Sequence, residues 1–173
     1  MKDTLKDVFS NVNDWLKFAE AKNAALIALN LGSIFGATTV LIQKDCVIPQ
    51  LILCYLYSFI VLNALGLSVA LFSFLPKLRV KPNLRVKPNV LYFGDIKNYE
   101  PDSYLDKLCE SCEKEVNGRS RLESDYARQI VINSQITFRK YSYFTAALIF
   151  TMSAILIPPL YILLILFLRL LTT

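Results

Sequence analysis

Three long runs of apolar residues, none of which contains a charge, divide this chain. They cover residues 23–42, 51–75 and 143–168. A helix of about 20 residues crosses a hydrocarbon core of roughly 30 Å, so each run predicts one transmembrane helix. The third run has 26 residues, too few for two spans, and Pro158-Pro159 inside it predicts a bend.

The stretch 1–22 predicts an amphipathic helix that continues into the first span, since no Pro or Gly separates the two. Trp15 and Phe18 lie where aromatic residues meet lipid headgroups. The alternative is a helix that lies on the membrane surface and only anchors the chain. Its apolar positions recur at threes and fours: Leu5, Val8, Phe9, Val12, Leu16 and Ala19.

The polar stretch 76–142 predicts a linker followed by helices. The hexamer LRVKPN occurs twice in tandem, at 78–83 and 84–89, and its prolines favour an extended linker. NVLYFGDI, at 89–96, is expected to form a short strand or a loop packed on helices. One helix is expected over 101–116, ending at Asn117-Gly118, and another from about residue 119 into the third span.

Small residues recur every fourth position in the first span, where one helix face would carry them all. Such a stripe lets another helix approach closely in lipid. The partner is either a second copy of the chain or the second span. Asn30 and Asn63 should also face a partner or water, because an amide facing lipid is costly. The residues of the stripe, here called the small-residue stripe, are Ala24, Ala28, Gly32 and Gly36.

Lysine and arginine counts orient the spans. The stretch 1–22 carries 4, the connection 43–49 carries 1, the stretch 76–142 carries 13, and the tail carries 1. The positive-inside rule therefore predicts a cytoplasmic N-terminus, a cytoplasmic middle segment and an external C-terminus. The expected fold is an all-α membrane protein with three transmembrane helices (23–42, 51–75, 143–170) and a small cytoplasmic helical bundle, assembled as a homo-oligomer.

Residues for catalysis or metal binding are not expected. The chain has no His, and its spans lack Asp, Glu, Lys and Arg, which counts against an enzyme and against a proton-coupled pump. Cys109 and Cys112 form a lone CxxC, read as two half-buried thiols. A basic cluster follows the second span and is expected to contact anionic lipid headgroups, or in part a phosphate-bearing ligand. Its members are Lys77, Arg79, Lys81, Arg85 and Lys87.

Three segments resemble the Pycsar effector transmembrane family: FAEAKNAALIALN (18–30), NVLYFGDIKNYEPDSYLDKL (89–108) and DYARQIVINSQITFRKYSYFTAAL (125–148). The resemblance implies a small bacterial inner-membrane protein of anti-phage defence. A companion cyclase would make a cyclic pyrimidine mononucleotide, and the effector would then impair the membrane by a pore or a bilayer defect. No cofactor and no nucleic acid are expected.

Basic side chains near the membrane would meet the ligand's phosphate, and an aromatic ring could stack on its base. The alternative for Phe93, Arg128 and Gln129 is that they only stabilise the bundle. The rival function is a constitutive membrane anchor that recruits a partner without permeabilising the bilayer. The candidate ligand-binding or gating residues are Lys22, Asn23, Phe93, Gly94, Asp95, Arg128, Gln129, Lys140 and Tyr141.

Overall fold

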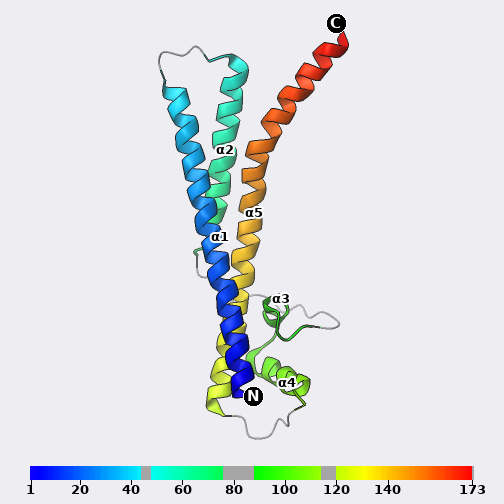
Figure 1. The fold of residues 1–173 in the computed structure, drawn as a ribbon. Helices are drawn as coiled ribbons and strands as arrows, with labels where there is room; N and C mark the ends of the chain where they lie inside the picture. The colour runs from blue at the N-terminus through cyan, green and yellow to red at the C-terminus, as the bar shows by residue number, and fades with distance from the viewer. Residues whose placement is uncertain (44–47, 76–87, 114–119, 173) are drawn as a thin grey trace. The chain divides into compact units, whose positions relative to one another are not determined.

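The structure is a computed structural model that describes residues 1–43, 48–75, 88–113 and 120–172. These residues form five helices and no strand (Figure 1). The chain divides into two compact units, which we call the polar unit (Met1–Ala21 and Leu75–Ser142) and the apolar unit (Lys22–Phe74 and Tyr143–Thr173). Most of the LRVKPN repeat, the basic cluster and Asn117-Gly118 lie outside the described residues.

Helix α1 (Lys2–Ile42) and helix α5 (Arg121–Thr172) are each continuous, which confirms that the polar helices run into the spans without a break. Helix α5 begins at a capping box that the sequence analysis missed. The Ser120 backbone N–H donates to Glu123 Oε2 at 3.0 Å, and the Glu123 N–H donates to Ser120 Oγ at 3.3 Å. The serine and the glutamate thus satisfy N–H groups that would otherwise lack partners. The helix also continues through Pro158-Pro159.

In the polar unit, the first half of α1 packs beside the first half of α5. The buried α1 residues Leu5, Val8, Val12 and Ala19 follow the heptad spacing of paired helices. Two short helices, α3 (Phe93–Ile96) and α4 (Pro101–Ser111), complete the unit's core with Phe93, Ile96, Tyr104, Leu105 and Leu108. The phenol of Tyr104 is fully buried and donates to the Val90 carbonyl at 3.1 Å.

Two details differ from the sequence expectation. Residues 93–96 form a helical turn instead of the expected strand or loop, because the Asp95 and Ile96 N–H groups both donate to the Tyr92 carbonyl. Helix α4 ends at Ser111 instead of residue 116, since Glu113 adopts a left-handed φ of 52°. A left-handed residue just past the last turn is a common way for a helix to stop.

The apolar unit contains the second half of α1, helix α2 (Gln50–Phe72) and the second half of α5. Each of the three helices is long and apolar enough to cross a membrane. Helix α2 ends three residues before the expected end of the second span. Leu26, Ala70 and Ala147 form a small buried cluster where the three helices meet.

Candidate functional site

Four aromatic rings gather in the polar unit, from α1, α3, α5 and the residue that precedes α3. We call Trp15, Tyr92, Phe93 and Tyr141 the aromatic cluster. Phe93 stacks on Tyr141, with ring centroids 5.6 Å apart and planes at 19°. Trp15 lies 5.7 Å from Phe93 and 6.3 Å from Tyr141. The cluster thus joins α3 to both long helices through aromatic contacts, each of which stabilises beyond its buried area.

The cluster has a buried half and an exposed half. Phe93 is only 6% exposed, whereas Trp15 is 41% and Tyr92 43% exposed. Burial, and next the charge of Tyr92, raise the pKa of the Tyr141 phenol, which favours its neutral form. Phe93 therefore serves as an anchor, and the rings available to a ligand are those of Trp15 and Tyr92.

Gly94 and Asp95 shape the chain beside the cluster. A Cβ placed on Gly94 would lie 2.3 Å from the Tyr92 ring, so glycine is needed for that ring to fold back over the backbone. The Asn89 backbone N–H donates to the buried Asp95 carboxylate at 3.0 Å. In the FGDI motif, these two residues thus set the path of the chain and the place of Phe93.

Polar pairs connect α1 and α5 inside the polar unit. Asn133 Nδ2 donates to Asn13 Oδ1 at 2.8 Å, and Lys140 Nζ lies 3.2 Å from Glu20 Oε1. Both pairs join residues that are 120 apart in sequence, so both belong to the same alignment of α1 against α5. Polar pairs between packed helices help to specify this register. Of the candidate basic residues, Lys140 is thus already matched with a carboxylate.

The structure does not bring all the candidate residues together. Phe93, Gly94, Asp95 and Tyr141 lie at the aromatic cluster, and Lys140 follows Tyr141 on α5. Arg128 and Gln129 are exposed and precede Lys140 by three turns of α5, a separation of about 17 Å. Being exposed, they are not core residues of the bundle. Lys22 and Asn23 belong to the apolar unit, where the Lys22 ammonium lies 5.5 Å from the Phe144 ring centroid.

Sequence reasoning missed Trp15, Tyr92 and Glu20 as neighbours of the candidate residues. Trp15 was assigned to lipid headgroups because of its place before the first span. Its contacts with Phe93 and Tyr141 join positions far apart in sequence. No local spacing signals such contacts.

A second group of polar residues lies inside the apolar unit. We call Asn30, Asn63 and Thr151 the polar layer; all three are buried. The Thr151 hydroxyl donates to Asn30 Oδ1 at 3.0 Å, with the Ala147 carbonyl also within reach at 3.1 Å. Asn63 Nδ2 donates to the Phe59 carbonyl at 2.8 Å, while Asn63 Oδ1 has no hydrogen-bond partner among the described residues.

Gly66 brings α2 against α5 beside this layer. A Cβ on Gly66 would lie 3.1 Å from Thr151 Oγ1 and 3.2 Å from the Ala147 carbonyl oxygen. Small residues allow such close approach of helices in a membrane. Thr151 therefore contacts both neighbours of α5, through Asn30 on α1 and Gly66 on α2.

The small-residue stripe is not used in this packing. Ala24, Ala28, Gly32 and Gly36 are all exposed, and no atom lies within 4 Å of a Cβ built on either glycine. The alternative that the stripe packs against the second span is thus wrong for the two glycines. The stripe instead lies on the outward face of α1, while Asn30 points into the unit.

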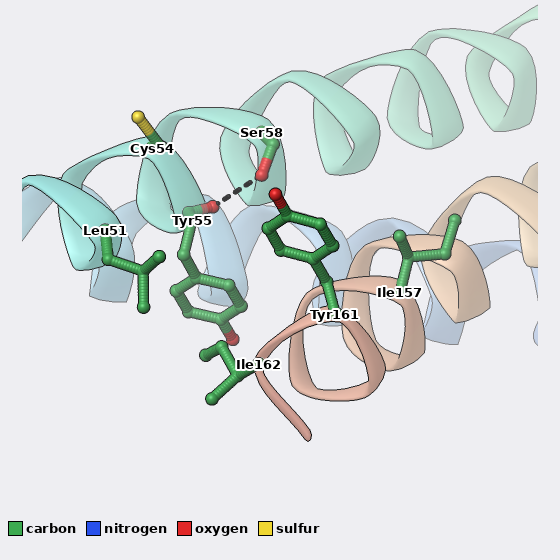
Figure 2. Close-up of a pocket in the computed structure, with 7 residues that line it drawn as sticks. All are labelled: Leu51, Cys54, Tyr55, Ser58, Ile157, Tyr161 and Ile162. Carbon is green, nitrogen blue, oxygen red and sulfur yellow. Dashed lines mark hydrogen bonds between the residues drawn. The ribbon is translucent and has the colours of Figure 1, made fainter. Parts of the chain in front are cut away.

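A groove lies between the first turns of α2 and residues 157–162 of α5. Figure 2 shows Tyr55 and Tyr161 lining it from opposite helices, with Leu51, Ile157 and Ile162 around them. Its volume is about 210 Å³. Within the apolar unit, Figure 1 shows the C-terminal part of α5 leaning away from α2.

These features define a multi-pass membrane protein with a compact polar unit attached to its spans. Among the described residues, no group of His, Cys, Asp and Glu could bind a metal ion. A family model described as the Pycsar effector protein domain matches residues 4–168 of the 173. The chain therefore belongs to the Pycsar effector family and is a membrane effector of anti-phage defence. A search of the curated proteins and a search of the solved structures each found no match.

Proposed function

We propose that this protein impairs the bacterial inner membrane when a cyclic mononucleotide binds to its polar unit. The observation that carries the proposal is the family match over nearly the whole chain, together with three helices able to cross a membrane. A companion cyclase would supply the ligand, a cyclic pyrimidine mononucleotide. The N-terminus and the polar unit would lie in the cytoplasm, where that ligand is made, and the C-terminus outside.

The aromatic cluster is the proposed place of base recognition. Trp15 and Tyr92 have exposed rings, and stacking of a base on an aromatic ring contributes about 1–3 kcal/mol. The cluster also contacts α1, α3 and α5 at once, through Trp15, Phe93 and Tyr141. A ligand that binds better to another arrangement of these helices would shift the protein toward that arrangement.

The Lys140–Glu20 pair supports a place for the phosphate. The Lys140 side chain is mostly buried and its partner Glu20 is half exposed, so an incoming phosphodiester would compete with that carboxylate. Charge-assisted bonds from lysine to phosphate are of similar strength to those with a carboxylate. Ligand binding would thereby exchange a contact between α1 and α5 for a contact with the ligand.

The small-residue stripe is the proposed surface for assembly with further copies. It faces away from the rest of the chain's described packing, and small residues favour close helix pairing in lipid. Replacing Gly32 and Gly36 by Leu should reduce the size of the assembly in detergent micelles. An unchanged size would show that copies meet elsewhere.

A leakage assay tests the proposed function. Purified protein in phosphatidylethanolamine–phosphatidylglycerol liposomes should release dye after cyclic CMP or cyclic UMP is added, and Trp15→Ala should weaken the response. Leakage that is the same with and without every nucleotide would refute the proposed nucleotide sensing. If no condition produced leakage, the result would favour the rival function, a constitutive anchor that recruits a partner.

A further inference from the structure

The faces of the three apolar helices indicate where water and ions would cross the membrane. The polar layer faces the interior of the apolar unit, as Asn30, Asn63 and Thr151 are at most 1% exposed. The outward faces carry exposed aliphatic and aromatic residues such as Phe35, Val61 and Leu160. A pore needs polar groups along its wall, because a wholly apolar constriction sheds water and stops conduction.

Exposed hydroxyls on the outer faces add little polar surface for a pore wall. Thr39 and Ser68 each donate to a carbonyl of their own helix, that of Phe35 and that of Ala64 respectively. Their hydrogen is therefore already used locally. Copies that assembled through unaltered outer faces would enclose a lumen with little polar lining from these helices.

The interior layer, by contrast, contains an acceptor that the closed packing leaves unused. Asn63 Oδ1 is fully buried and has no hydrogen-bond partner among the described residues. A buried polar group without a partner is costly, most of all in a membrane. Any state that admits water to Asn63 removes this cost, so the closed packing carries a local bias toward opening.

The groove of Figure 2 shows where the helices already diverge. Ser58, which lines the groove, precedes Asn63 by about 7.5 Å along α2, and Ile157 follows Thr151 by about 9 Å along α5. Between groove and polar layer, α2 and α5 still have to part at their close contact. That contact is Gly66 against Thr151 and the Ala147 carbonyl.

We propose that permeation opens within each chain, by separation of α2 from α5 at Gly66 and Thr151, so that water and ions pass along Asn30, Asn63 and Thr151. This inference rests on the proposed function, membrane permeabilisation, and names the site at which it occurs. Assembly through outer faces then organises the copies without lining the path. A pore lined by outer faces and a general bilayer defect are the two outcomes that the test must separate from it.

A disulfide between α2 and α5 tests the proposal directly. The Cβ built on Gly66 lies 3.1 Å from Thr151 Oγ1, and in a disulfide a Cβ lies about 3 Å from the opposite sulfur. Gly66→Cys with Thr151→Cys, in a chain whose native cysteines are changed to Ser, should therefore cross-link. Mass spectrometry measures the linked fraction.

The linked protein should lose nucleotide-triggered dye leakage from the liposomes and regain it after reduction with dithiothreitol. The same double-cysteine protein, kept reduced with dithiothreitol from the start, is the control, and leakage is expressed as the ratio of the linked to the reduced sample. Leakage from the fully linked protein would overturn the proposal, while leaving the proposed function intact. Absence of leakage from the wild-type chain with every nucleotide would instead defeat the proposed function itself.

Thiol labelling provides a second measurement that does not depend on conduction. Asn63→Cys should react with a water-soluble methanethiosulfonate only after cyclic CMP or cyclic UMP is added. Ser68→Cys lies on the exposed face of the same helix and is the matched control, whose labelling should not change with the nucleotide. Labelling of Asn63→Cys that stays absent in the triggered, leaking protein would contradict a path along the polar layer.

Discussion

Phe93 anchors the turn of the FGDI motif to the two long helices, and its removal should loosen the polar unit locally. Its side chain is 6% exposed and its ring lies within 5.7 Å of the centroids of Trp15, Tyr92 and Tyr141. Truncating a buried Phe to Ala destabilises a core by about 3–5 kcal/mol. We expect Phe93→Ala to lower the free energy of local opening of α3 and α4 by an amount in this range.

Hydrogen–deuterium exchange of the full chain in detergent micelles measures that opening. Since 1.4 kcal/mol is a factor of ten, protection of amides in 93–111 should fall between about a hundredfold and several thousandfold. Phe93→Leu keeps most of the apolar volume but loses the aromatic pairs, each of which contributes about 0.5–1.5 kcal/mol, so its effect should be smaller than that of Phe93→Ala.

Leu91→Ala is the matched control, because Leu91 precedes the same turn and is 51% exposed. Its exchange in 93–111 should stay close to that of the wild type. If Phe93→Ala left protection in this segment unchanged, the aromatic cluster would not be what stabilises α3 against α1 and α5. The reasoning from burial and ring contacts would then be refuted.

Three further outcomes follow from the polar unit. Gly94→Val should displace the Tyr92 ring, seen as increased proteolysis near Asn89, because its Cβ would collide with that ring; unchanged cleavage would contradict the close approach. Lys140→Gln should cost at most about 1 kcal/mol of unfolding free energy in denaturant, as its partner Glu20 is half exposed; a larger loss would indicate a stronger pair. Burial raises the pKa of the Tyr104 phenol above 10, so the folded unit retains this proton where the unfolded chain releases it, and stability should fall as pH rises above about 10. Tyr104→Phe should show a shallower alkaline loss in the same unfolding measurement, and an equal slope would exclude this phenol as its source.

Local features of the candidate site followed from sequence only in part. The sequence motif pointed to Phe93, Gly94 and Asp95 as candidate residues. The structure places them in one turn, where each has a separate packing role. Arg128 and Gln129 come from an equally distinct segment, yet both are exposed and lie about 17 Å along α5 from Lys140. A motif shows that residues occur together along the chain, and it carries no information on which distant side chains meet them.

The sequence by itself determined the membrane-spanning elements of this protein. A helix can lie in hydrocarbon when it has enough consecutive apolar residues without a charge. This is a property of each local stretch, here 23–42, 51–75 and 143–168. The three helices that are long and apolar enough to cross a membrane contain these stretches in whole or in large part.

Only the tertiary structure decided which face of each helix meets another helix. In α1, the small-residue stripe and Asn30 are both suited to packing, and the structure places Asn30 inside and Gly32 and Gly36 outside. The choice depends on Thr151 and Gly66, which lie on two other helices. Helix pairing in lipid depends on the fit of both surfaces at once, so no single segment specifies it.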